Sequence, residues 1–429
     1  MVNGLGKARV TTILRRRVMR AYERLLKYVS YPTGSNPEAT EVPSNPDEFI
    51  FARDLATEME TLGFAHVGVD EHCYVRGTIP ANIENYDGPV LGLVVHIDVS
   101  SAAAYTDIKP QVIHYTGGDL VQDAEKAYVV SRDDYPFLAR YEGMDIVTSD
   151  GTTLLGADDK AGVSEIMTLA EQLQADPTIK HGTIEVCFTP DEEIGRGSDF
   201  FNIEGFNADV AYTVDGEAFG EVQGETFNAL SAVVRINGFS IHPGSAKNMM
   251  KNACRIACEF DGLIPDSETP EHTEGYEGFY HLIEMKGDVE RMDLDYIIRD
   301  HDLALAQGRA EHMHRIAEFL NSKYGEGTVE VSIEESYRSM IEIINEHPRL
   351  LELPIQILKD MGVEADTSPI RGGTDGATLS FKGLPCPNLG VGGHNFHGRK
   401  EFAVVQSMDS VVELLVRLVQ AIANEPKTL

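Results

Sequence analysis

Residues 91–100 read LGLVVHIDVS, an apolar run that ends in a histidine and an aspartate. Leu91 to Val95 predict a strand buried on both faces, as in a parallel sheet that helices cover. His96 and Asp98 are two apart, so in a strand their side chains point to the same face. Open α/β sheets bind ligands beyond the carboxyl ends of their strands. The pair therefore indicates either the floor of a site or a buried histidine whose proton a carboxylate accepts.

Strand and helix patterns alternate up to about residue 215, which predicts an α/β fold with a mainly parallel sheet flanked by helices. Residues 161–176 have the apolar spacing of a helix. Residues 182–195 and 208–217 each begin as an apolar strand and run into acidic residues. Three strands that end in histidine or acid at one sheet edge would gather these groups into one site.

The pattern changes near residue 220. Residues 229–240 and 327–337 alternate between polar and apolar, which predicts amphipathic antiparallel strands, and helical patterns lie between them over 246–260 and 306–324. We therefore expect a smaller α+β domain, of ordinary domain size, inserted as a lid into a larger one. The expected boundaries are 1–219 and 338–429 for the two parts of the larger domain and 220–337 for the insertion.

The composition limits the classes of partner. The chain has 429 residues with 69 acidic and 36 basic side chains, a formal net charge of -33. Such an acidic chain repels phosphate backbones, which argues against nucleic-acid binding. The five cysteines are scattered and indicate no disulfide framework. A reducing, cytoplasmic location is therefore the expectation.

The first thirty residues contain no apolar run long enough for a signal peptide or a membrane span, so no membrane partner is expected. Their apolar residues fall at helical spacing, which predicts an amphipathic first helix. Its predicted apolar face consists of Leu14, Val18, Tyr22 and Leu25, and its predicted solvent-exposed face of Arg15, Arg16 and Arg17.

Histidines and carboxylates gather in the segments around the predicted strand ends. Without thiolates, these donors suit zinc, manganese or cobalt. Two histidines and three carboxylates exceed the needs of one zinc and fit two metals about 3.5–4 Å apart. Taken alone, each motif has a plainer explanation: DEE is also an acidic turn, and ADDKAG is also a capped helix start. The candidates are His96, Asp98, Asp158, Asp159, Glu192, Glu193, Asp215 and His397.

These motifs together resemble a known family. HIDVS, LLGADDKAG, FTPDEEIGRG and AYTVDGE are similar to the successive metal-site motifs of the peptidase T family. This family comprises tripeptide aminopeptidases of the di-zinc metallo-exopeptidase superfamily, which also holds carboxypeptidase G2 and acetylornithine deacetylase. The stretches HTEGYEGFYHL, YIIRD, PIRGGTDGA and GLPCPNLGVGG resemble that family in particular. The resemblance covers nearly the whole chain.

The resemblance implies two zinc ions per subunit, for which Co²⁺ or Mn²⁺ could substitute. One zinc would be held by His96 and Asp215, and the other by Glu193 and His397. Asp158 would bridge both ions.

The resemblance also implies the catalytic roles. Asp98 would orient the His96 ring. Glu192 would be the general base for a hydroxide that bridges the metals and attacks the peptide carbonyl. The spacing of Glu192 and Glu193 leaves their roles open, and only the resemblance separates them. It further implies a cis peptide bond between Asp158 and Asp159.

Three further residues are candidates for substrate binding. His242 resembles a superfamily histidine that reaches over the site on closure, although a turn histidine before Pro243 explains it equally well. Arg371 has the planar donor fork that suits the terminal carboxylate of a peptide. Arg299 is a second candidate of this kind, with a structural salt bridge as the alternative.

The sequence therefore predicts a zinc aminopeptidase that releases the N-terminal residue from tripeptides. Its expected partner is a short peptide substrate, and the resemblance implies a homodimer through the inserted domain. One alternative is a related di-zinc deacylase or dipeptidase. The other is a non-catalytic, metal-bound peptide-binding protein.

Overall fold

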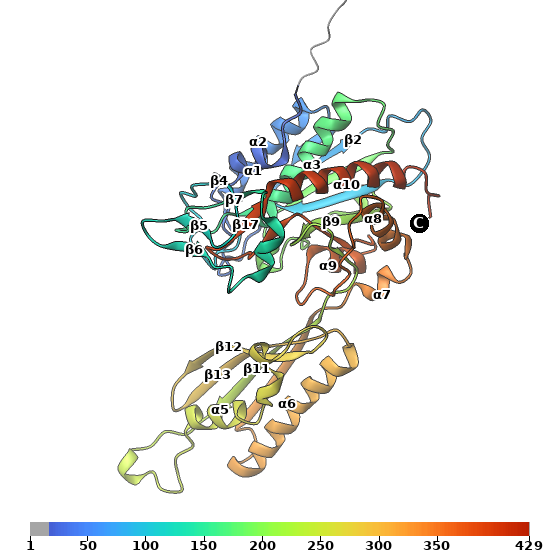
Figure 1. Cartoon of the computed structure of the whole chain (residues 1–429). Coiled ribbons are helices and arrows are strands. Elements are labelled where there is room, and N and C mark those ends of the chain that lie inside the picture. The colour runs from blue at the N-terminus through green and yellow to red at the C-terminus, as the bar shows by residue number, and fades with distance from the viewer. Residues whose placement is uncertain (1–16, 429) are drawn as a thin grey trace, which may run out of the picture.

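The computed structural model describes residues 17–428, which are built around a seven-stranded sheet (Figure 1). Its four central strands are parallel to one another, and the outer strands pair antiparallel. The predicted α/β fold is confirmed, with the parallel pairing confined to the centre of a mixed sheet. In spatial order the strands are β1 (Ala65–Val69), β2 (Val75–Ile79), β8 (Ile184–Thr189), β3 (Leu91–His96), β9 (Val210–Gly216), β15 (Asn388–Gly390) and β10 (Val222–Gln223).

Alternate residues of the central strands pack into different cores. In β3, Leu93 and Val95 belong to the larger core, whereas Val94 belongs to a smaller core on the other face. Burial on both faces explains the continuous apolar run in the sequence. The helices that contribute to the larger core are α1 (Ala21–Tyr28), α2 (Glu48–Thr61), α3 (Ala157–Ala175), α7 (Ile341–Ile344), α8 (Arg349–Asp360) and α10 (Val405–Ile422). Helix α4 (Ile203–Phe206) contributes to the smaller core, and α9 (Asp375–Phe381) contributes to both.

A second sheet and a hairpin have no counterpart in the sequence analysis. The sheet orders its strands β16–β17–β7–β4, and the hairpin is β5–β6. Because β16 pairs antiparallel with β17, the residues between them form the loop that carries His397. The strands are β4 (Gln111–His114), β5 (Leu120–Asp123), β6 (Tyr128–Val130), β7 (Asp145–Thr148), β16 (Gly393–His394) and β17 (Phe402–Val404).

Residues 228–337 gather around a core of their own (Figure 1). Four antiparallel strands in the order β12–β13–β11–β14 form a sheet, against which two helices pack. The homodimer expected through this part of the chain stays a prediction. The elements are β11 (Asn228–Asn237), α5 (Ala253–Asp261), β12 (Phe279–Gly287), β13 (Arg291–Asp300), α6 (Leu303–Tyr324) and β14 (Val329–Tyr337).

One expected helix is shorter than its apolar pattern. The sequence predicts a helix over 246–260, but α5 begins only at Ala253. Residues 247–249 form a turn instead, and Lys251 pairs with Phe239 in an isolated β-bridge, so the helix does not begin before that bridge. Asn252 then caps the helix, because its side chain accepts an amide hydrogen from the first turn.

The N-terminal helix also starts later than expected. Helix α1 begins at Ala21, so Val18 precedes it, while Leu25 is buried as predicted. None of the helices within residues 17–428 is long and apolar enough to cross a membrane. The predicted positions Leu14, Arg15 and Arg16 lie outside the described residues. Short 3-10 helices complete the described fold: η1 (Pro136–Tyr141), η2 (Glu192–Ile194), η3 (Pro243–Ser245), η4 (Asp266–Glu268) and η5 (Pro270–His272).

Candidate metal centre

The strands β3, β8 and β9 are adjacent and parallel, so their carboxyl ends lie at one edge of the sheet. His96 is the last residue of β3, and Asp215 is next to last in β9. β8 ends at Thr189, and the helix η2 with Glu192 and Glu193 follows closely. The three strands thus bring a histidine and three acids to one place.

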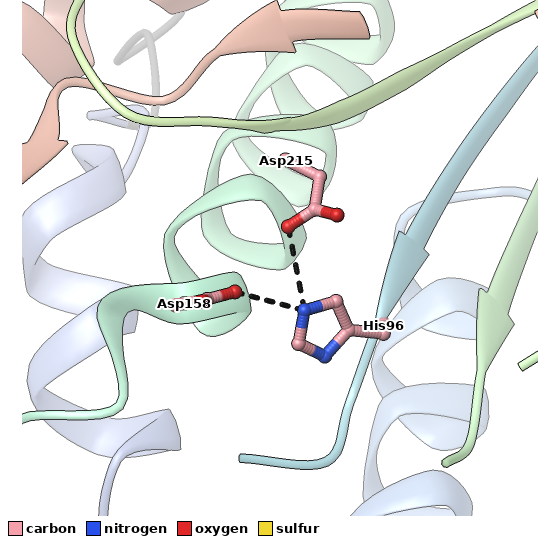
Figure 2. Close-up of side chains that lie close together, drawn as sticks. All are labelled: His96, Asp158 and Asp215. Carbon is pink, nitrogen blue, oxygen red and sulfur yellow. Dashed lines mark hydrogen bonds and ion pairs between the residues drawn. The ribbon is translucent and has the colours of Figure 1, made fainter. Parts of the chain in front are cut away.

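Figure 2 shows a first cluster, formed by His96, Asp158 and Asp215. The Nε2 atom of His96 lies 2.9 Å from Asp158 Oδ1 and 3.3 Å from Asp215 Oδ1. The three candidate ligand atoms lie within 4.8 Å of one another. His96 is only 2% exposed, so the imidazole meets these carboxylates inside the protein.

Glu193, His397 and Asp158 form a second cluster. The Nε2 atom of His397 lies 2.9 Å from Glu193 Oε2 and 3.0 Å from Asp158 Oδ2. Asp158 therefore turns one carboxylate oxygen toward each cluster. This arrangement suits a carboxylate that bridges two cations.

An irregular start of α3 presents Asp158 to both clusters. Asp158 and Asp159 have non-helical backbone angles, and the peptide bond between them is cis, as the resemblance implies. Gly156 precedes them with a φ of +80°, in the left-handed region that glycine adopts readily. The Asp158 carboxylate consequently projects from the beginning of the helix toward His96 (Figure 2).

Asp98 contacts more than the His96 ring. Its Oδ1 atom lies 3.2 Å from His96 Nδ1 and also accepts the Glu192 amide hydrogen at 3.1 Å. Its Oδ2 atom accepts the Glu193 amide hydrogen at 3.1 Å and the Ser35 hydroxyl hydrogen at 2.9 Å. Asp98 therefore fixes the backbone of the turn that carries both glutamates.

Two buried polar residues that the sequence analysis missed hold the other ligand segments. Asn388, on the neighbouring strand β15, accepts the Asp215 amide hydrogen through Oδ1 at 3.2 Å. Glu401 accepts amide hydrogens from the segment that leads to Asp158. A lone Asn in CPNLG and a lone Glu in GRKEF carry no local signal of such a role.

Burial and neighbouring charges set the proton affinities of the clusters. Burial raises the pKa of Glu193 to about 7, with a further rise from Asp158 that His397 opposes. Burial also raises the pKa of Asp215 to about 6, against the opposing effect of His96. Hydrogen bonds to Asp158 and Glu193 raise the pKa of His397 to about 11. The clusters together hold three carboxylates and two imidazoles, an excess of negative charge that favours a divalent cation.

A cavity of about 520 Å³ opens beside both clusters. This volume lies in the range of roughly 300–1,000 Å³ that small-molecule sites occupy. Glu192 belongs to neither cluster and lies in the cavity wall. The other polar side chains in the wall are Asp158, Asp215, Glu217, Glu221, Gln223, Arg371, Thr374, Asn388 and His397.

The three candidate substrate residues lie in different surroundings. Arg371 lines the cavity, and its guanidinium donates to Gly275 O, Glu277 O and Thr273 Oγ1 in the inserted part of the chain. Arg371 thus joins the cavity to the inserted residues.

Arg299 and His242 are not among the residues that line the cavity. The Arg299 guanidinium lies 5.1 Å from the centre of the Tyr337 ring. Within residues 17–428 no carboxylate forms an ion pair with Arg299, so the salt-bridge alternative finds no partner there. His242 is exposed, and its Nδ1 atom accepts the Gly244 amide hydrogen at 3.1 Å.

Comparison with known proteins places this geometry in a family. The model described as "Peptidase family M20/M25/M40" matches residues 148–421. Peptidase T from Caldanaerobacter subterraneus subsp. tengcongensis is 47% identical over 399 residues, which cover 93% of this chain and 97% of that relative.

Solved structures have the same fold. A tripeptidase from Staphylococcus aureus superposes with a TM-score of 0.74 at 22% identity, covering 95% of this chain and 98% of the other. A dinuclear metal binding peptidase of the M20 family from Bacillus subtilis superposes with a TM-score of 0.62 at 15% identity, covering 94% and 98%. On the strength of the family match and the near full-length relative, this chain belongs to the M20/M25/M40 family of peptidases.

Proposed function

We propose that this chain is a metal-dependent aminopeptidase that removes the N-terminal residue from tripeptides. The observation that carries the proposal is the pair of ligand clusters that share Asp158 beside a cavity with Glu192 in its wall. The relative named peptidase T supports the choice of substrate.

We propose two Zn²⁺ ions as the cofactor, with Co²⁺ or Mn²⁺ as substitutes. Each cluster offers one imidazole nitrogen and two carboxylates, a donor set that these cations accept. Among the described residues, Glu193 Oε1 is buried without a hydrogen-bond partner, so this carboxylate keeps lone pairs for a cation. When bound, the cations would polarise the peptide carbonyl and lower the pKa of a water molecule at the site.

We assign the role of general base to Glu192. Its carboxylate belongs to neither cluster, so it is free to exchange protons. Burial, and then the charge of Asp215, raise the pKa of Glu192 well above the usual glutamate value. A carboxylate in the cavity wall, outside both clusters, can take a proton from water and later transfer it to the leaving amine. Asp98 holds the Glu192 backbone in place for both transfers.

The free N-terminus of a peptide substrate carries an ammonium group. Binding this group near the clusters requires anionic side chains. Glu217 and Glu221 line the same cavity as Asp158. The Glu217 amide donates to Glu221 Oε2 at 2.8 Å, which fixes the second carboxylate. We propose that these two carboxylates hold the α-ammonium group of the substrate. An N-acylated substrate has no such group and would gain nothing from them.

The carboxyl end of the substrate needs a cation. Arg371 lines the cavity, and three of its five N–H groups donate to residues of the inserted part of the chain. The other two N–H groups remain for the terminal carboxylate of the substrate. Arg299 and His242 remain predicted contacts that depend on closure of the inserted domain over the site. Closure would also exclude water from the reaction.

Substrate length and terminus test the proposal. Zinc-loaded protein is incubated with trialanine, N-acetyl-trialanine, dialanine and tetraalanine, and the released amino acid is quantified. Release of alanine from the free tripeptide alone is the expected result. Cleavage of the acetylated peptide would favour the deacylase alternative, and cleavage of dialanine alone would favour a dipeptidase. Tight tripeptide binding without release would favour the non-catalytic binder.

We further propose that the enzyme works in the cytoplasm. All five cysteines are free thiols, the state that a reducing compartment maintains. Fractionation of cells that produce the protein would test this location.

A further inference from the structure

One buried carboxylate collects the backbone amides of the segment that leads to Asp158. Glu401 Oε2 accepts the amide hydrogens of Leu155 at 2.7 Å and Gly156 at 2.8 Å. Glu401 Oε1 accepts the amide hydrogen of Asp158 itself at 3.1 Å. Glu401 is only 1% exposed, so water does not compete for these bonds.

These amides need a partner from outside their own segment. Because Asp158 and Asp159 depart from helical geometry, the start of α3 is irregular at this point. Buried amides without acceptors are costly, and a carboxylate is a strong acceptor for several of them at once. Glu401 therefore stabilises the conformation in which the Asp158 carboxylate faces both clusters.

The same residue is anchored to the loop of the other histidine ligand. Glu401 lies four positions after His397, between β16 and β17. Its own amide donates to Gly398 O at 3.2 Å, and its carbonyl oxygen accepts the Thr148 hydroxyl hydrogen at 3.1 Å. The backbone of Glu401 thus fixes the His397 loop while its side chain fixes the Asp158 segment.

We propose that Glu401 is a positioning residue that sets the separation of His397 and Asp158 and so preorganises the centre for two cations. This inference rests on the metal centre proposed above. It goes beyond that centre because Glu401 belongs to neither ligand cluster and is not among the residues that line the cavity. Its effect should therefore appear in metal binding, before any peptide is present.

The chain offers substitutions that test this role. Glu401→Gln keeps the size but replaces one oxygen with an NH₂ group, so at least one of the three amides would face a donor. Glu401→Asp keeps the charge but shortens the reach. Glu165→Gln is the matched control. Like Glu401, Glu165 is a buried glutamate, but it lies in α3, outside both clusters and the cavity. Burial raises the pKa of Glu165 well above the usual glutamate value.

The experiment measures Zn²⁺ affinity of the metal-free proteins by calorimetry against a competing chelator, together with the absorption spectrum of the Co²⁺ forms. We expect affinity to fall about 10–100-fold in Glu401→Gln and Glu401→Asp, with an altered Co²⁺ spectrum. Glu165→Gln should match the wild type in both measurements. Thermal unfolding of the metal-free proteins separates a loss of stability from a loss of preorganisation.

Each outcome decides between the two proposals. Wild-type affinity and an unchanged Co²⁺ spectrum in Glu401→Gln would overturn the role of Glu401, even if that variant unfolds at a lower temperature. If Glu401→Gln does not fold, Glu401→Asp gives the same decision. Wild-type protein that binds no zinc would instead overturn the metal centre itself.

Discussion

Substitution of Asp98 by Asn tests how the turn with both glutamates is held. Asp98 is fully buried, and its two carboxylate oxygens meet the amides of Glu192 and Glu193, the Ser35 hydroxyl and the His96 ring. Asparagine has nearly the same shape but only one oxygen acceptor. Its NH₂ group would therefore face an N–H or O–H group whose hydrogen the native carboxylate accepts.

The expected magnitude follows from these contacts. With the Asn oxygen in the Oδ2 position, the Glu193 and Ser35 bonds remain and the Glu192 amide faces a donor. Loss of one hydrogen bond to a charged group lowers the free energy of unfolding by about 1.5–3 kcal/mol. The His96 ring keeps the Asp98 carbonyl oxygen at 3.1 Å, so its orientation survives. Because a residue behind the ligands is changed, we expect kcat/KM to fall about 10–100-fold.

The assay combines urea unfolding with tripeptide hydrolysis by the zinc-loaded protein. Ser35→Ala is the matched control, because it removes one neutral donor from Asp98 and leaves both amide bonds. The control should lose about 0.5–1.5 kcal/mol of stability and keep its kcat/KM. Wild-type kcat/KM in Asp98→Asn would refute the reasoning that Asp98 positions the glutamate turn.

Further predictions concern the metals, the base and the ammonium site. Glu192→Gln should keep both metals and lower turnover about 10²–10⁴-fold, and a wild-type rate beside normal metal content would exclude it as the base. His96→Ala should instead lose metal in the same metal analysis. Burial raises the pKa of Glu221 to about 7, so its carboxylate gains charge as pH rises through that value. KM for a tripeptide should therefore fall as pH rises through this value, and Glu221→Gln should weaken this dependence. Chelation should abolish turnover and lower the melting temperature, and zinc should restore both; activity that persists in metal-free protein would disprove metal dependence.

Much of the fold follows from local pattern. The apolar run of β3 ends at His96. Both faces of this strand are buried, so its consecutive residues are all apolar and the strand can be recognised from the sequence. Parallel neighbours must end at the same edge, so the acids that follow β8 and the acid at the end of β9 are expected near His96 once the α/β fold is inferred. The resemblance, and not the pattern, gave Glu193 rather than Glu192 as the ligand. The structure brings Glu193 Oε2 to His397.

The residues behind the ligands could not be read from the sequence. Glu401 and Asn388 act through hydrogen bonds to backbone amides that lie far away in the chain. Any buried acid or amide can make such bonds, so neither residue type nor spacing identifies them. The late start of α5 has a similar cause, because the bridge between Phe239 and Lys251 is a tertiary contact that helical periodicity does not encode.

The contacts of Arg371 connect substrate length to the position of the inserted domain. Its guanidinium lines the cavity and lies 5.1 Å from the Phe227 ring centre and 5.6 Å from that of Phe279, on either side of the join to the inserted strands. It also donates to the loop around Gly275. A shift of the inserted domain would therefore move the Arg371 donors relative to Asp158 and Asp215. If Arg371 binds the terminal carboxylate as proposed, its distance from Asp158 and Asp215 sets the length of peptide that fits. That distance is set only when the inserted domain is in place. Closure of the domain and selection of substrate length are therefore the same event.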